Sequence, residues 1–213
     1  MSAFEEAAAG LADVGRFFHA RGWVLGTSGN LSAVLSRDPL RIAITASGKD
    51  KGDLDDEHFL EIDGTGSVVA GSGRPSDEMP LHLVLVRERG AGAVLHSHSV
   101  WATLLSEAKA AEGSLSLTGW EMLKGLAGVK THEHVERVPI LGNSQDYARL
   151  AAELQDALSR HPSCHGVLLR GHGLYAWGRD LPEARRHVEV LEFLFEVEGR
   201  RGALGRGETP WPS

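Results

Sequence analysis

The feature of this sequence that most constrains its fold is the alternation of short apolar segments between two periodicities. Residues 41–45 have the alternating pattern of a strand, and residues 93–98 begin as an apolar run of strand length that turns polar at its end. Residues 2–21 and 147–160 repeat apolar residues at helical spacing, and residues 79–89 are interpreted as a helix that ends at Gly90. Glycines and polar residues separate these segments. Because strands and helices interleave along the chain, we expect helices on both faces of a mixed, largely antiparallel sheet. The predicted fold class is a single-domain α/β/α sandwich.

The ends of the chain also carry local signals. Ser2 and Glu5 form an S-x-x-E capping box at the start of the first helix. Residues 182–198 predict a closing helix, and residues 199–213, rich in Gly, Pro and Arg, predict a loose tail. No repeat or second unit is visible, so residues 1–213 are expected to form one domain. The remaining predicted elements are strands at 31–35, 68–70, 135–140 and within 166–175, and helices at 99–109 and 120–126.

Composition excludes several classes of protein. The formal net charge of −7 repels phosphodiester backbones, which argues against a nucleic-acid partner. Apolar runs such as residues 167–169 are far shorter than the roughly 20 residues that cross a bilayer. Cys164 is the only cysteine, so no internal disulfide can form. The first residues carry Glu5 and Glu6 where a signal peptide would be basic, and we therefore expect a cytoplasmic protein.

A pair of histidines at the end of an apolar strand is the first candidate for chemistry. His96 and His98 are two residues apart, and alternate residues of a strand project to the same side. This spacing lets two imidazoles bind one metal ion. The alternative is a pair of polar histidines that only ends a strand. A third ligand is needed from elsewhere, because two histidines alone bind weakly.

His172 is the candidate for that third ligand. Gly171 and Gly173 flank it, directly after an apolar strand, and glycines permit unusual backbone angles and close backbone approach. A plain turn histidine is an equally good interpretation of the same residues. The competing pair His132 and His134 lies in a charged segment without apolar support, which favours a solvated loop.

Two short loops are rich in hydrogen-bond donors. Residues 26–32 contain two glycines, three hydroxyl groups and the amide of Asn30, and residues 45–49 add Ser47, Gly48 and Lys49. Such loops present N–H and hydroxyl groups to anions, as phosphate-binding loops do. Neither matches the fingerprint of an ATP or dinucleotide site. The two loops together favour a phosphate ligand, although each alone is compatible with an ordinary turn.

Two glutamates are candidates for proton transfer. Glu121 stands between apolar neighbours, where burial would raise its pKa towards values useful for acid/base catalysis. Glu78 stands at the start of a predicted helix, and its alternative role is to stabilise that N-terminus with a negative charge. Cys164 has no partner motif beside it and is interpreted as structural.

The order of five short motifs resembles the class II aldolase/adducin family. They are Gly-Thr-Ser-Gly-Asn-Leu-Ser (26–32), Ser-Gly-Lys (47–49), Pro-Ser-x-Glu-x-x-x-His (75–82), His-Ser-His-Ser (96–99) and Arg-Gly-His-Gly (170–173). The match runs from about Gly26 to Trp177 and continues into the last helix. The ordered set is specific, whereas each motif alone is common.

The resemblance implies a class II aldolase-like fold, one zinc ion per subunit and a small phosphorylated ketose as substrate. It further implies a homotetramer with active sites between subunits. The implied metal ligands are His96, His98 and His172. The implied phosphate contacts are Gly29, Asn30, Ser47, Gly48 and Ser76.

Within the family, residues 120–125, 138–146 and 171–178 resemble the dehydratase branch that serves methionine salvage, with Glu121 as acid/base. Glu78 matches the catalytic glutamate of the sugar-phosphate aldolases, so aldolase or 4-epimerase activity stays an alternative. Asp77 departs from the aldolase pattern, because a carboxylate is a poor phosphate partner. An adducin-like association module is a third hypothesis, which the three histidines argue against.

Overall fold

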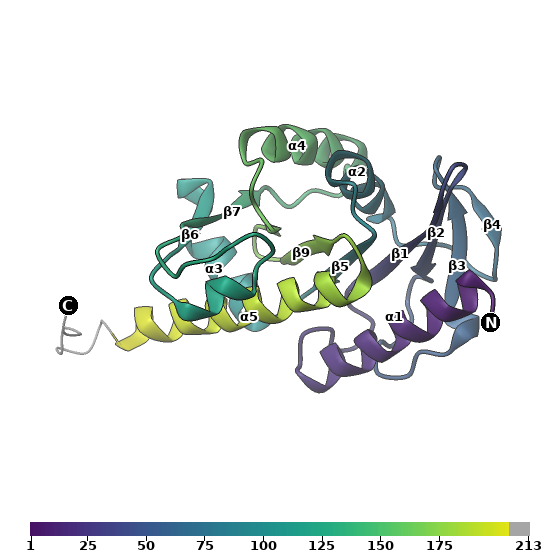
Figure 1. Ribbon diagram of the computed structural model, residues 1–213, viewed down its shortest axis with the longest axis horizontal. Coiled ribbons are helices and arrows are strands. Elements are labelled where there is room, and N and C mark those ends of the chain that lie inside the picture. Colours follow the sequence, from purple (N-terminus) through teal and green to yellow (C-terminus); the bar gives the residue numbers. More distant parts are fainter. Residues whose placement is uncertain (205–213) are drawn as a thin grey trace.

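The computed structural model describes residues 1–204, in which strands and helices interleave as the periodicity predicts (Figure 1). The strands are β1 (Asn30–Arg37), β2 (Leu40–Thr45), β3 (Phe59–Asp63), β4 (Val68–Ala70), β5 (Ala93–Ser97), β6 (Ser114–Leu117), β7 (Glu136–Leu141), β8 (Gly166–Leu169) and β9 (Gly173–Gly178). The helices are α1 (Ala3–Ala20), α2 (Met79–Arg89), α3 (Val100–Ala108), α4 (Tyr147–Arg160) and α5 (Leu181–Leu204). Three short 3-10 helices are η1 (Asp56–His58), η2 (Ala110–Glu112) and η3 (Glu121–Gly125).

Local sequence explains where the helices begin and end. The Ser2 side chain accepts a hydrogen bond from the Glu5 N–H, and the Glu5 side chain accepts one from the Ser2 N–H. The predicted capping box is therefore present. Helix α2 ends at Gly90, whose φ of 58° is the left-handed conformation that glycine adopts at helix ends. Helix α4 is capped by Asp146, whose side chain accepts a hydrogen bond from the Arg149 N–H.

All nine strands described in residues 1–204 form one sheet in the order β4-β3-β2-β1-β5-β9-β8-β7-β6. Every neighbouring pair is antiparallel except β7 and β8, which are parallel. Helices cover both faces, with α2 and α4 on one side and α1, α3 and α5 on the other (Figure 1). The predicted α/β/α sandwich with a largely antiparallel sheet is confirmed.

Each face of the sheet has its own apolar core. Leu95 and Leu174 pack with Phe195 of α5 on one face, and Val94 and Val167 pack with the α2 and α4 helices on the other. Alternation along β5 therefore sends successive side chains into opposite cores. None of the helices within residues 1–204 combines the length and apolarity needed to span a bilayer.

Some elements differ from the sequence-based expectation. Strands β3 and β6 were not predicted, the apolar stretch 166–175 forms two strands joined by a turn, and residues 121–125 form a 3-10 helix. Helix α5 runs to Leu204, past Gly199, where the sequence predicts the tail to begin. The rest of that predicted tail, residues 205–213, lies outside the described residues.

Candidate metal centre and active site

Four side chains that could bind a metal ion converge at one end of β5 and β9. One nitrogen each of His96, His98 and His172 and one carboxylate oxygen of Glu78 all lie within 4.8 Å of one another. His98 Nε2 lies 2.7 Å from His96 Nε2 and 3.1 Å from His172 Nε2. Within residues 1–204 no other cluster of three or more His, Cys, Asp or Glu side chains converges in this way. Imidazoles with one carboxylate suit a divalent transition metal such as zinc.

Strand register brings these residues together. His96 is paired with Asn30 of β1 and with Tyr175 of β9, so the histidine pair lies in the middle of the sheet. His172 lies in the turn between β8 and β9, after Gly171 with φ of +60°. A Cβ on Gly173 would lie 2.0 Å from the main-chain oxygen of β5 next to it, so only glycine permits this approach. The flanking glycines therefore act on the backbone as the sequence predicts.

The environment keeps the three imidazoles neutral. Burial lowers the pKa of His96 well below its usual value, and the neighbouring His98 and His172 lower it further. Burial also lowers the pKa of His98 to about 4 and lowers the pKa of His172. Neutral imidazole is the form that offers a lone pair to a metal ion. The site is thus prepared for a cation at neutral pH.

Hydrogen bonds behind the imidazoles fix their orientation. His96 Nδ1 donates to the main-chain oxygen of Leu174 at 2.9 Å, which leaves the lone pair on Nε2 for a metal. The Tyr175 ring stacks on the His96 ring with centroids 3.9 Å apart. Thr103 Oγ1 donates to the main-chain oxygen of His172 at 2.9 Å and ties the turn to α3. These contacts fix the His96 ring and the backbone of His172.

Glu78 is held by a buried chain of hydrogen bonds. Asn30 Nδ2 donates to Glu78 Oε2 at 2.7 Å, and Asn30 Oδ1 accepts from His82 Nε2. Ser32 Oγ lies 2.7 Å from His82 Nδ1 at the other end. Glu78 Oε1 lies 3.3 Å from His172 Nε2, so the carboxylate joins the imidazoles. The Ser32–His82–Asn30–Glu78 chain is called the relay below.

A cavity of about 290 Å³ opens beside this cluster. Its lining contains both donor-rich loops predicted from the sequence as well as Glu78, His98 and His172. The predicted phosphate contacts that line it are Gly29, Asn30, Ser47, Gly48 and Ser76. Lys49 is not among the lining residues, whereas Lys51 is. The metal-ligand cluster and the donor loops therefore share one pocket.

Asn30 has a different environment from the one expected of a phosphate contact. Its side chain is only 3% exposed, and both its oxygen and its nitrogen are engaged by the relay. Gly29 precedes it with φ of +73°, and a Cβ there would lie 2.6 Å from the His96 main-chain oxygen. The glycine thus lets the first loop pass directly beside the histidine strand.

Glu121 lies outside this pocket within a single chain. Its side chain is 70% exposed on η3, where it pairs with Lys124 and lies 3.8 Å from His132. The hydrogen bond from Lys124 holds the pKa of Glu121 below its usual value. The expectation that burial raises this pKa is therefore wrong for the single chain. The apolar neighbour Leu123 faces the core, whereas Glu121 points to solvent.

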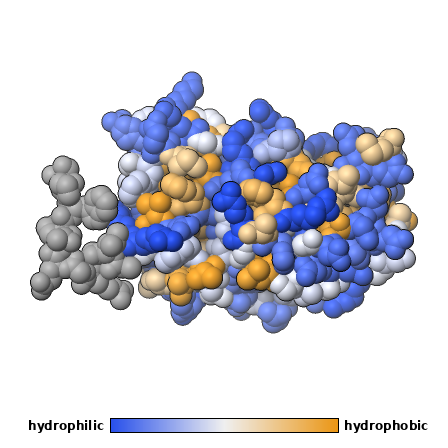
Figure 2. Space-filling model, turned by 90° about the horizontal axis from the view of Figure 1, so that it is seen from below, coloured by the Kyte–Doolittle hydropathy of each residue, from blue (hydrophilic) through white to orange (hydrophobic). Residues whose placement is uncertain are grey.

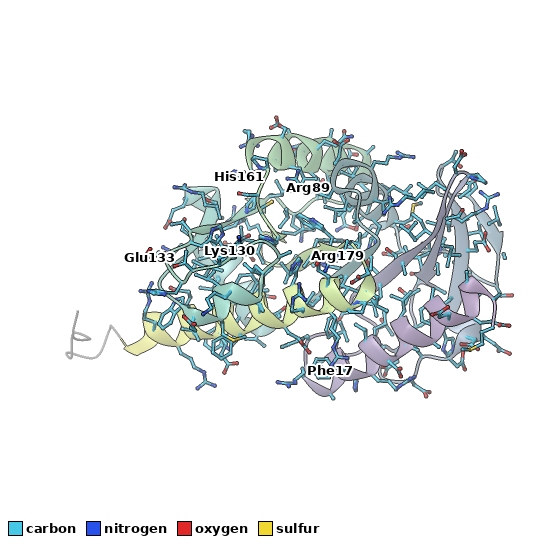
Figure 3. The ribbon with its side chains drawn as sticks, viewed as in Figure 1. Phe17, Arg89, Lys130, Glu133, His161 and Arg179 are labelled. Carbon is cyan, nitrogen blue, oxygen red and sulfur yellow. The ribbon has the colours of Figure 1, made fainter. Side chains whose placement is uncertain are left out.

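The second histidine pair does not form a metal-ligand cluster. His132 is 57% exposed, and His134 Nε2 lies 2.9 Å from Glu136 Oε2. Figure 3 labels Lys130 and Glu133 of the same loop, which runs beside α5 and away from β1. The loop is thus polar, as the sequence predicts.

His82, Tyr175 and Lys51 are among the residues of the site that were not predicted from the sequence. His82 follows Glu78 by four residues and so lies on the same helix face, a spacing that could have revealed it. Tyr175 could have been placed opposite His96 only from the strand register. Burial of Lys51 depends on packing between loops, and a lysine in a polar segment carries no signal for it.

Comparison with known proteins supports a common origin for this site. The family model "Class II Aldolase and Adducin N-terminal domain" matches residues 9–198. A methylthioribulose-1-phosphate dehydratase of Methylococcus capsulatus is 44% identical over 204 residues, covering 95% of this chain and 98% of its own. The protein of the same name from Pseudomonas aeruginosa is 47% identical over 195 residues, covering 91% of this chain and 94% of its own.

Solved structures agree with the fold. An L-fuculose 1-phosphate aldolase superimposes with a TM-score of 0.77 at 26% identity and covers 98% of this chain and 91% of its own. The L-fuculose-1-phosphate aldolase of Thermus thermophilus gives a TM-score of 0.74 at 27% identity, covering 94% of this chain and 97% of its own. With a family match over most of its length and this histidine-lined pocket, the chain belongs to the class II aldolase and adducin family.

Proposed function

We propose that this chain is a methylthioribulose-1-phosphate dehydratase, which removes water from 5-methylthioribulose 1-phosphate to give 2,3-diketo-5-methylthiopentyl 1-phosphate in methionine salvage. The observation that carries this proposal is the identity of 44% and 47% to proteins of that name over more than nine tenths of the chain. The shared pocket of metal-ligand cluster and donor loops is consistent with it. The enzyme is accordingly a carbon–oxygen lyase.

The resident metal is proposed to be zinc, held by His96, His98 and His172, with Glu78 as a fourth donor. The residues fit such an ion, because their ligand atoms lie within 4.8 Å and a main-chain oxygen orients the His96 ring. A bound zinc ion supplies Lewis-acid polarisation of the substrate's carbonyl and hydroxyl oxygens.

The two donor loops are proposed to bind the phosphate. Gly29, Ser47, Gly48 and Ser76 line the pocket, and their main-chain N–H and hydroxyl groups are the donors proposed for the phosphate. Because the side chain of Asn30 is occupied in the relay, its contribution is to hold Glu78 in place and to offer its backbone. This arrangement positions the ketose between the loops and the imidazoles.

Glu121 is proposed to transfer protons during the elimination. A carboxylate base takes the proton from C3, the C4–O bond breaks, and the departing hydroxyl group leaves with a proton as water. The resulting enol then tautomerises to the 2,3-diketone. Since Glu121 lies outside the pocket of its own chain, this role requires the Glu121 of a second copy.

Exposed apolar side chains support such an assembly, which we propose is a homotetramer with active sites between subunits. Val100 and Leu104 of α3, Met122 of η3 and Phe193 of α5 are between 40% and 65% exposed. Their elements are neighbours in the fold, and Figure 2 shows apolar patches among charged groups on the α1/α5 face. Because Met122 is the next residue to Glu121, burying these side chains against another copy would place the Glu121 segment at an interface between subunits.

An aldolase is the second candidate function. Glu78 lies within the ligand cluster, whereas Glu121 does not, and the aldolases named above share the fold. An aldolase would break the C3–C4 bond and release an aldehyde, whereas the dehydratase retains the carbon chain.

The deciding experiment is incubation of purified enzyme with 5-methylthioribulose 1-phosphate while diketone absorbance and aldehyde release are followed. We expect diketone without aldehyde. Glu121→Gln should fold and bind metal but lose about 10²–10⁴-fold in turnover, as loss of a general acid/base does. Glu133→Gln, which alters an exposed acid of the same region, is the matched control. Aldehyde release, with Glu121→Gln active and Glu78→Gln inactive, would establish the aldolase.

The metal assignment has its own test. Elemental analysis of protein purified without chelators should give about one zinc ion per chain, and His96→Ala should lose it. Retention of full metal content by His96→Ala would place the metal elsewhere.

A further inference from the structure

Lys51 is a buried cation that no part of the proposed chemistry uses. Its side chain is only 1% exposed, although it lies in the loop that follows β2. Burying an ammonium group is costly unless partners compensate for the lost water. Lys51 Nζ donates to the main-chain oxygen of Thr27 at 3.0 Å and to that of Lys49 at 2.7 Å. Both acceptors are uncharged, so these contacts do not neutralise the ammonium.

The position of Lys51 relates it to both donor loops. Thr27 belongs to the first loop and Lys49 to the second, so the ammonium group ties them together. An ammonium group has three N–H donors, and the loop carbonyls account for two of them. Lys51 also lines the 290 Å³ cavity, beside Ser47 and Gly48. One N–H donor of a residue that lines the pocket is therefore not used by either loop carbonyl.

Charge distinguishes the two sides of this pocket. Among its lining residues Lys51 is the only lysine or arginine, and the metal-ligand side carries Glu78, His98 and His172. Burial lowers the pKa of Lys51 to about 8, with Asp50 and Glu78 opposing that shift, so the group is still mostly protonated at pH 7. A cation among N–H and hydroxyl donors is the environment that binds a phosphate dianion.

We propose that the Lys51 ammonium is the cationic contact for the substrate's phosphate and the residue by which this pocket selects a phosphate ester. The proposal rests on the proposed function for the identity of the sugar, but not for the phosphate contact itself. The neighbouring Lys49, which the sequence favours, does not line the pocket.

The test separates a phosphate contact from a simple tether between loops. Binding of inorganic phosphate to the metal-loaded enzyme is measured by calorimetry for the wild type, Lys51→Met and Lys51→Arg. We expect Lys51→Met to weaken phosphate binding about 10- to 100-fold, because a hydrogen bond to a charged group is lost. Lys51→Arg, which keeps the cation, should restore most of it. Lys109→Met removes an exposed lysine paired with Glu112 and should leave phosphate affinity unchanged.

Steady-state kinetics give the second readout. Lys51→Met should raise KM for the phosphorylated substrate more than it lowers kcat, and kcat/KM should fall by a larger factor for the phosphorylated substrate than for the dephosphorylated sugar. Metal content should stay at the wild-type level. Unchanged phosphate affinity in Lys51→Met, with lower thermal stability, would overturn the proposal and leave Lys51 as a structural tether. Phosphate binding is measured without turnover, so failure of the dehydratase assay would not affect this result.

Discussion

Replacing His82 by alanine should both destabilise the protein and loosen Glu78, because His82 is the centre of the relay. Burial lowers the pKa of His82 to about 3, so its ring is neutral at pH 7 and has one donor and one acceptor. Nε2 donates to Asn30 Oδ1, and Nδ1 accepts from the Ser32 hydroxyl group. The ring itself is 0% exposed, so water cannot replace these bonds in the native structure.

The loss of stability expected in His82→Ala comes from the buried polar groups that lose their hydrogen-bond partner. Ser32 is 1% exposed and Asn30 is 3% exposed, and each loses its partner in His82→Ala. A buried polar group left without a partner costs about 1–3 kcal/mol, so two such groups cost about 2–6 kcal/mol. That is a large part of the roughly 5–15 kcal/mol by which a domain is stable. Ser32→Ala leaves only the Nδ1 atom of His82 without a hydrogen-bond partner and should lower the free energy of unfolding by about half as much.

Urea unfolding monitored by circular dichroism measures these free energies. His132→Ala is the control, because its side chain is 57% exposed and such changes usually stay within about 0.5 kcal/mol. Chelator competition should also show about 10- to 100-fold weaker metal binding in His82→Ala, as loss of an outer-shell partner does. A destabilisation below about 1 kcal/mol, or an equal effect of Ser32→Ala, would refute the reasoning.

Other parts of the molecule give four further predictions. Burial raises the pKa of Glu192 to about 7, so the folded chain keeps a proton that the unfolded chain loses near pH 4.5. The free energy of unfolding should therefore fall by up to about 3 kcal/mol as pH rises between these two values. Urea titrations at pH 5 and 8 should show this fall in the wild type and not in Glu192→Gln. The Cys164 thiol, buried with its pKa raised to about 11, should resist iodoacetamide at pH 8 until urea unfolds the chain. Gly173→Ala should disrupt pairing of β5 with β9 and lower the melting temperature, whereas Gly202→Ala, with open space around its Cβ, should not. Ser47→Ala should raise KM more than it lowers kcat, and an unchanged KM would remove it from the phosphate site.

Two helices could be predicted to the residue, from apolar spacing in one and from an end signal in the other. The predicted bounds of 147–160 are those of α4, whose apolar residues repeat at helical spacing after the Asp146 cap. The predicted bounds of 79–89 are those of α2, which is marked by the glycine at its end, since Leu81 to Val86 are all buried and the helix has no polar face there. Strand β6 was missed because it has only four residues and depends on pairing with β7, which lies about twenty residues later. Short strands are defined by their partners more than by their own sequence.

In the candidate site, too, residues with a local sequence signal could be predicted, whereas residues that depend on distant packing could not. Spacing on a strand favoured the His96 and His98 pair, and the flanking glycines made His172 a candidate that only the family resemblance selected as the third ligand. The exposure of Glu121 and the burial of Lys51 could not be predicted, since both depend on how loops pack against distant segments. A lysine between polar residues has the same local pattern whether it faces solvent or a pocket.

The central place of His96 has a consequence for how catalytic activity can diversify. Its strand lies between β1 and β9, in the part of the sheet that is covered on both faces, where most substitutions would destabilise the whole fold. Glu121, in contrast, lies on an exposed 3-10 segment whose residues can change at little cost to stability. Under the proposed function, the buried framework of metal ligands can be kept while the peripheral acid/base group is exchanged. A dehydratase and an aldolase built on this fold would then differ mainly in exposed segments around a common buried centre.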